Sequence, residues 1–181
     1  MPHTSPARRG RMLIRRGSRD DKSPRVVRSI ASPHEGAICL GCDAVFRRKT
    51  WRRRWLSATD RLAAARVLCP ACRQVRSRRS FGEVVLRGTT VDGRRDVILR
   101  RIRHIAERAA FTQPERRVVA IERRSDGVHV LTTSQKLAHR VAAELTKAFG
   151  GRARYVWSDR GGGLYSVWEA PEGPVARHAH R

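Results

Sequence analysis

Apolar residues recur with two distinct periods from residue 81 onward, and these periods predict the order of strands and helices. Short runs rich in β-branched and aromatic residues predict five strands: 83–87, 117–123, 128–132, 154–157 and 164–168. Apolar residues three or four positions apart predict one helix over 94–110, after the turn signal Asp92-Gly93. A second helix is predicted to start at Thr133 or Ser134 and to end at Gly150-Gly151.

The predicted elements follow the order strand, helix, strand, strand, helix, strand, strand. The first six match the split βαβ arrangement of ferredoxin-like domains, in which two helices cover one face of an antiparallel sheet. We expect the seventh element to extend an edge of that sheet. The predicted core consists of the two helical stripes: Ile98, Ile102, Ile105, Ala109, Leu137, Val141, Leu145 and Phe149. The fold class predicted for this part is therefore α+β.

The first 80 residues lack this regularity and divide into two predicted segments. Residues 1–36 are rich in Arg, Ser, Pro and Gly and predict a disordered basic arm. Residues 37–80 contain all four cysteines, and a helix is predicted over 58–67 with Leu62, Ala65 and Leu68 at helical spacing. With an α+β domain over 81–170 and a flexible tail over 171–181, the chain is predicted to have four parts.

Two CxxC pairs, Cys39/Cys42 and Cys69/Cys72, account for every cysteine, and 26 residues separate them. A CxxC turn places two thiolates on the same side of a tight loop, so two such turns can complete a closed tetrahedral site. The sequence therefore predicts one structural zinc ion in a Cys₄ zinc ribbon. A single CxxC motif is also typical of thiol-redox proteins, and a thiol-redox or zinc-sensing protein is the alternative reading of these cysteines.

The charge of the chain indicates a polyanionic partner. The sequence has 181 residues, with 40 Lys and Arg against 16 Asp and Glu and a net charge of +24. Residues 1–80 hold 21 basic and 5 acidic side chains, and residues 81–181 hold 19 and 11. Such a chain repels itself unless a polyanion neutralises it, and arginine pairs bidentately with phosphate. Nucleic acid is therefore the expected partner, and no small-molecule substrate is evident.

Two tryptophans lie among basic residues between the cysteine pairs, and more arginines follow the second pair. The candidate nucleic-acid-binding residues are Arg47, Arg48, Lys49, Trp51, Arg52, Arg53, Arg54, Trp55, Arg73, Arg76, Arg78 and Arg79. Tryptophan stacks on bases while neighbouring arginines neutralise phosphates. In the alternative reading, Trp51 and Trp55 pack inward as the small core of the ribbon. Stacking residues suit single strands and irregular folds, which favours RNA over duplex DNA, although a DNA-binding or transcription-associated ribbon is the alternative.

Other function classes lack support in the sequence. No pair of carboxylates and no Ser/His/Asp arrangement stands out, so we expect a protein that is not an enzyme. No apolar run approaches the ~20 residues that a membrane span needs. The basic start of the chain has no apolar region of signal-peptide length, so we expect a cytoplasmic protein without membrane contact.

Several of these motifs together resemble a known family. The segment from Gly127 to Ala142, followed by Leu145 and Phe149-Gly150-Gly151, resembles part of the large-ribosomal-subunit export adaptor, the Nmd-three family. CxxC pairs precede the α/β part there too, and the arrangement is most similar to a small bacterial branch. The resemblance covers about residues 39–169. It implies a non-catalytic protein that associates with ribosomes or ribosomal RNA, with the four cysteines as zinc ligands. The adaptor has more CxxC pairs and further domains, so nuclear export is not implied.

Overall fold

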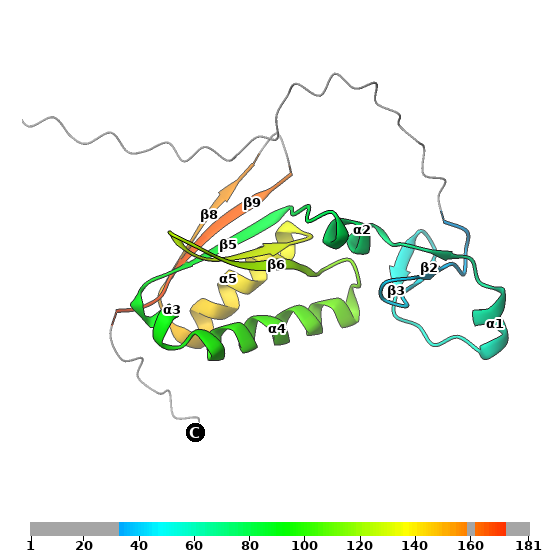
Figure 1. Cartoon of the computed structure of the whole chain (residues 1–181), viewed down its shortest axis with the longest axis horizontal. Coiled ribbons are helices and arrows are strands. Elements are labelled where there is room, and N and C mark those ends of the chain that lie inside the picture. The colour runs from blue at the N-terminus through cyan, green and yellow to red at the C-terminus, as the bar shows by residue number, and fades with distance from the viewer. Residues whose placement is uncertain (1–32, 159–161, 173–181) are drawn as a thin grey trace, which may run out of the picture. The chain divides into compact units, whose positions relative to one another are not determined.

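The computed structural model describes residues 33–158 and 162–172 of the chain, and these form a mixed α+β structure with two sheets (Figure 1). The predicted N-terminal arm falls, up to residue 32, outside the described residues. The same holds for the predicted tail from residue 173. Two separate clusters of buried residues accompany the two sheets, one around the cysteines and one in the C-terminal part.

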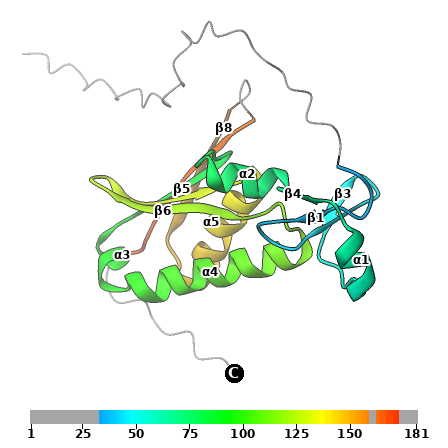
Figure 2. The same cartoon turned by 45° about the vertical axis from the view of Figure 1, so that its right-hand side comes forward.

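The larger sheet has five strands in the order β6-β7-β5-β9-β8. Its strands are β5 (Gly82–Arg87), β6 (Val118–Arg124), β7 (Gly127–Thr132), β8 (Arg152–Trp157) and β9 (Leu164–Glu169). Its helices are α3 (Thr89–Gly93), α4 (Arg95–Thr112) and α5 (Gln135–Phe149). The helices α4 and α5 lie on one face of the sheet, as Figure 2 shows, and we call this assembly the α+β domain. Asp92 and Gly93, predicted as a turn, belong instead to the short helix α3.

The apolar stripes predicted for the two long helices, α4 and α5, are the faces that pack against the larger sheet. All eight residues of the two predicted apolar stripes are buried in a single cluster that also contains Trp168 of β9. Ser134 caps α5, because its hydroxyl accepts a hydrogen bond from the backbone N–H of Leu137 at 3.3 Å. Gly150, at a φ of 77°, ends the same helix in a conformation that other residues rarely adopt.

One part of the predicted topology is wrong. The seventh element was expected to extend an edge, but β9 lies inside the sheet, parallel to β5, and β8 forms the edge. Leu164, Ser166 and Trp168 of β9 are fully or almost fully buried, whereas β8 carries exposed arginines at positions 152 and 154. A strand with apolar residues on both faces suits an interior position, and a charged strand suits an edge.

The smaller sheet has four strands in the order β3-β2-β1-β4, and with two short helices it forms what we call the cysteine module. Its elements are β1 (Ile38–Cys39), β2 (Val45–Arg47), β3 (Thr50–Arg52), α1 (Ala58–Ala63), β4 (Arg66–Val67) and α2 (Pro70–Arg76). The helix predicted over 58–67 is thus shorter than expected, and its last two residues form β4. No residue of α1 is buried, and Leu62 is exposed, so of the predicted stripe only Leu68, which lies after β4, packs against the core of the module.

Candidate metal centre and basic hairpin

Two parallel strands bring the cysteine pairs together. In the register of β1 and β4, Ile38 lies beside Arg66 and Cys39 beside Val67. Each strand leads directly into one CxxC turn, so both turns emerge at the same end of the sheet. Cys69 then caps α2, with Pro70 as the first helical residue, a position that tolerates the missing N–H of proline.

The four sulfur atoms have the spacing of a tetrahedral metal site. All four Sγ atoms lie within 4.8 Å of one another, and the Sγ atoms of Cys42 and Cys69 are 3.9 Å apart. Metal–sulfur bonds of ~2.3 Å in a tetrahedron require sulfur separations of about 3.8 Å. The cysteines are free rather than disulfide-bonded, and three of the four are buried. The residues therefore fit a bound metal ion with four thiolate ligands.

Backbone amides form hydrogen bonds with two of the four sulfur atoms. The Sγ of Cys39 accepts hydrogen bonds from the N–H groups of Gly41, at 3.4 Å, and Cys69, at 3.2 Å. The N–H of Cys72 donates to the Sγ of Cys69 at 3.4 Å. Hydrogen bonds of this kind stabilise negative charge on a thiolate, which is the form in which a cysteine binds a metal ion.

The thiols of the cluster differ in pKa. A hydrogen bond from the Cys69 thiol lowers the pKa of Cys42 to about 5, and the same bond together with burial raises the pKa of Cys69. Burial raises the pKa of Cys72 to about 11. One thiolate is thus available near neutral pH, and a metal ion would displace the remaining protons.

Gly41 is required for the close approach of the two turns. A Cβ atom at this position would lie 2.9 Å from the Sγ and 3.2 Å from the Cβ of Cys72. We expect Gly41→Ala to displace the Cys72 sulfur and to weaken metal binding, with a cost of about 1–3 kcal/mol. Competition with a chromogenic chelator would measure the affinity. Gly93→Ala is the matched control, because a Cβ there meets nothing within 4 Å. Equal affinity of both variants would contradict the prediction.

The two tryptophans of the basic segment have different environments. Trp51 is only 8% exposed and packs against Phe46, with ring centroids 5.4 Å apart, in the buried cluster of the cysteine module. Its ring is therefore part of the small core and is not available for stacking on a base. Trp55 is 82% exposed. The alternative that both rings pack inward thus holds for Trp51 alone.

The basic side chains of this segment project into solvent from the β2–β3 hairpin and the chain after it. Those that the structure places in exposed positions are Arg47, Arg48, Lys49, Arg52, Arg53 and Arg54. Arg48 and Lys49 form the two-residue turn with φ values of 49° and 61°. Such turns favour Asn and Gly, so two basic residues there are held in a strained backbone conformation. Their charges are concentrated at the tip of the hairpin.

The arginines after the second cysteine pair differ from one another in their exposure and in their ion pairs. Arg76, Arg78 and Arg79 are exposed, and Arg73 is half-buried. Arg78 forms an ion pair with Glu122 of β6 at 2.8 Å, so part of its charge is neutralised within the chain. The predicted basic surface therefore consists mainly of the hairpin and the residues up to Trp55.

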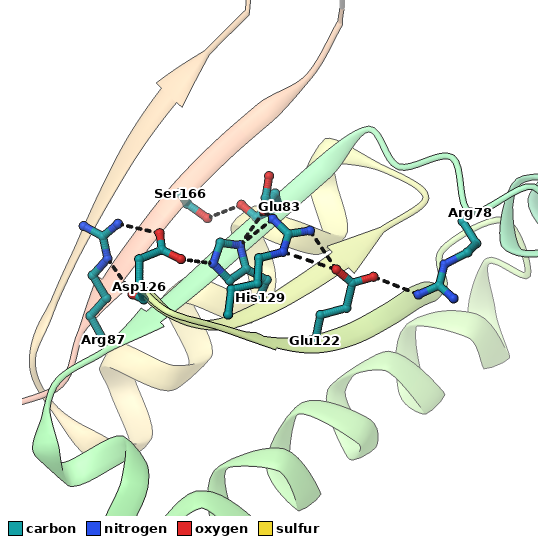
Figure 3. Close-up of polar contacts among 8 residues, drawn as sticks. Arg78, Glu83, Arg87, Glu122, Asp126, His129 and Ser166 are labelled. Atoms are coloured by element: carbon teal, nitrogen blue, oxygen red, sulfur yellow. Dashed lines mark hydrogen bonds and ion pairs between the residues drawn. The ribbon is translucent and has the colours of Figure 1, made fainter. Parts of the chain in front are cut away.

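A charged network on the α+β domain was not foreseen from the sequence (Figure 3). His129 is only 3% exposed, and its Nδ1 and Nε2 atoms lie 2.6 Å from Glu83 and 2.7 Å from Asp126. Both ring nitrogens of His129 therefore lie at hydrogen-bond distance from a carboxylate. Arg87 binds Asp126 at 3.0 Å, and Arg124 binds both Glu83 and Glu122. These residues meet through strand pairing, which sequence spacing does not reveal.

The network makes the stability of the domain depend on pH. Hydrogen bonds from Arg124 and Arg78 lower the pKa of Glu122, and a hydrogen bond from His129 lowers that of Asp126. The ionised carboxylates therefore stabilise the folded state above the ordinary pKa values of 4.5 and 3.8. This contribution is lost as the pH falls through the lowered folded-state values.

We expect Glu122→Gln to destabilise the protein by up to about 1 kcal/mol at neutral pH, and this difference should vanish at a pH well below the lowered folded-state pKa of Glu122. Urea unfolding, followed by circular dichroism at several pH values, would measure this difference from the wild type. Glu107→Gln, which removes a carboxylate outside the network, is the control. A difference that stays constant with pH would contradict the assignment of the stabilisation to the ionised carboxylate.

None of the helices in the described part of the chain is long and apolar enough to cross a membrane. A comparison of the sequence with models of known protein families and with curated proteins finds no match. The function is therefore inferred from the residues of the chain and their geometry.

Proposed function

We propose that this protein is a non-catalytic RNA-binding protein in which a structural zinc ion holds a basic hairpin in place. The observation that carries the proposal is the cluster of exposed basic residues on the β2–β3 hairpin and up to Arg54, next to the exposed ring of Trp55. In the described part of the chain, the side chains of these basic residues make no ion pair. A polyanion would supply the missing counter-charges.

Zinc is the metal that best suits the site. Four thiolates in a tetrahedral arrangement are typical of structural zinc, whereas hard cations such as magnesium and calcium prefer oxygen ligands. A closed set of four ligands leaves no coordination position for water, which favours a structural rather than a catalytic ion. The zinc ion would connect the two CxxC turns and thereby hold the ends of β1 and β4 together.

RNA is proposed rather than duplex DNA because of the shape of the basic segment. Two short helices follow the basic hairpin: α1, with six residues and one arginine, and α2, with seven residues and Cys72 on its buried side. Helices of at most two turns are poorly suited to read the major groove, and the buried side of α2 is already used by the cysteine cluster. An exposed tryptophan between arginines is suited to single-stranded or irregular RNA.

The cellular target, which follows from the family resemblance, and the finer fold, which follows from the cysteine spacing and the order of elements, are part of the proposal. The cysteine module is inferred to be a zinc ribbon, and the α+β domain a ferredoxin-like domain with β9 inserted between β5 and β8. The likeness to the export-adaptor family directs the proposal to the large ribosomal subunit, with the protein acting in the cytoplasm. Thiol-redox chemistry is less well supported, because all four sulfur atoms converge on one centre.

The experiment that tests the proposal is purification of the full chain from its own cells without nuclease treatment. Ribosomal RNA that is enriched over its cellular abundance, together with one zinc per chain, would support it. Competition between structured RNA and duplex DNA at one salt concentration would then separate RNA from DNA binding, because backbone contacts are strongly salt-dependent. Preferential binding of duplex DNA, or rapid labelling of the thiols without a chelator, would contradict it.

A further inference from the structure

An exposed aromatic cluster lies at the β8 edge of the α+β domain, separate in sequence from the basic hairpin. Trp157, the last residue of β8, is 52% exposed, and Val156 beside it is also exposed. Since β8 is the edge strand, one side of it has no neighbour among the described strands. A large exposed aromatic ring at a sheet edge is unfavourable in water and is typical of a binding surface.

The ring of His139 lies beside two other rings of this cluster. His139 of α5 is 4.8 Å from Tyr155, at an interplanar angle of 31°, and 6.3 Å from Trp157, at 29°. Burial raises the pKa of Tyr155, so its hydroxyl stays protonated. His139 is exposed and Trp157 half-exposed, and the cluster therefore offers flat ring surface to solvent on an ordered support of helix and strand.

The charge around the rings is positive. The exposed positions of α5 hold Lys136, His139 and Lys147 together with alanines, and Lys136 and His139 are three residues apart on one helix face. Glu144, the acidic residue of α5, is half-buried and forms an ion pair with Arg101 of α4 at 2.8 Å. No exposed carboxylate of α5 therefore opposes an anion beside the rings.

We propose that this aromatic edge, formed by His139, Tyr155 and Trp157 with Lys136, is a second RNA-contact surface. A base of single-stranded RNA stacks on Trp157, and Lys136 neutralises an adjacent phosphate. This inference rests on the proposed function and adds a contact that the zinc-held hairpin does not provide. Stacking on an aromatic side chain is worth ~1–3 kcal/mol per base and tolerates any base sequence.

Two features of the domain favour RNA at this edge over other occupants. Arg152 and Arg154 lie on β8, and charged edge strands disfavour pairing with a further protein strand. On the open face of the sheet, Glu83 of β5 and His129 of β7 are already engaged in the charged network. The charged groups of that network already bind one another, whereas the exposed positions of α5 carry basic side chains and no carboxylate.

The test compares Trp157→Ala with the wild-type full chain for binding to a single-stranded oligoribonucleotide of about 10 nucleotides. We expect the variant to bind about 5- to 150-fold more weakly, the factor that corresponds to the loss of one stacked base. Binding to heparin, a polyanion without bases, should be unchanged. Phe111→Ala is the matched control, because Phe111 is 69% exposed on α4 and lies outside the cluster. Trp157→Phe, which keeps a flat ring, should recover most of the affinity.

Other outcomes would overturn the proposal in distinguishable ways. Unchanged RNA affinity of Trp157→Ala in a chain that still binds RNA would reject the aromatic edge alone and leave the basic hairpin intact. An equal loss for RNA and heparin would show that no base is stacked there. A wild-type dimer that dissociates in the Trp157→Ala variant would identify the edge as a protein contact. If the wild type binds neither polyanion, the proposed function fails and this surface with it.

Discussion

Replacement of one metal ligand, in Cys39→Ser, is expected to release the bound metal and to unfold the cysteine module while the α+β domain remains folded. The buried cluster of the module is small and consists largely of the cysteines themselves, with Trp51 as its largest member. Structural zinc supplies roughly 10–16 kcal/mol of apparent binding free energy in small zinc domains, more than such a cluster can replace. The sulfur of Cys39 accepts hydrogen bonds from the backbone N–H groups of Gly41 and Cys69, one in each CxxC turn. Its replacement therefore also weakens the contacts that orient the two turns.

Hydrogen exchange with mass spectrometry would measure this outcome, because amides of β1–β4 should lose protection while those of β5–β9 keep it. Elemental analysis of the same sample should fall from one metal ion per chain to none. Addition of a chelator to the wild type is the matched treatment without a mutation, and it should produce the same exchange pattern. Retained protection of β1–β4 after metal removal would contradict a metal-dependent module.

Reversal of the charges at Arg52, Arg53 and Arg54, by substitution of all three with Glu, is expected to lower RNA affinity by about 100-fold or more at moderate salt. All three side chains are exposed, so the folded state should lose no packing. Each phosphate contact with single-stranded RNA contributes about −0.7 to the slope of log K against log salt concentration. Loss of three contacts should therefore make that slope shallower by about 2.

Titration of a fluorescent RNA at several salt concentrations would give both quantities. The matched control is the triple substitution of Arg100, Arg103 and Arg108 on α4 by Glu, which changes the net charge equally at other exposed positions. A weaker effect of the control would assign the binding to the hairpin segment rather than to overall charge. Equal effects of the two triple variants would reject the hairpin as the principal contact.

The metal centre is the part of the candidate site that the sequence predicted most completely. A CxxC turn is local, so its two sulfur atoms converge whatever the rest of the chain does, and two such turns with no cysteine left over suggest one centre. The pairing of β1 with β4, which brings the turns to one end of a sheet, was not predicted. Its strands have two residues each, and Arg66 and Val67 had been assigned to a helix on the basis of helical spacing. Strand pairing across 27 residues decided their conformation.

The basic surface was predicted by composition but only partly by position. Trp51 and Trp55 are equivalent in the sequence, four residues apart between arginines. The tertiary structure separates them, because Trp51 lies on β3 opposite Phe46 and turns into the module, whereas Trp55 lies beyond the strand. The aromatic edge of His139, Tyr155 and Trp157 was not predicted either, since it forms only when α5 packs beside β8.

The sequence by itself determined the four candidate metal ligands, the two amphipathic helices and the segments that form the strands of the α+β domain, because each depends on spacing within a short stretch of chain. The tertiary structure alone decided that β9 lies beside β5, that Trp51 is buried, and that His129 meets Glu83 and Asp126. These outcomes depend on which strands pair and in which register. Strand order depends on which segment buries more apolar surface in the core. β9, with buried Leu164 and Trp168, therefore lies inside the sheet, and β8, which carries arginines, forms the edge.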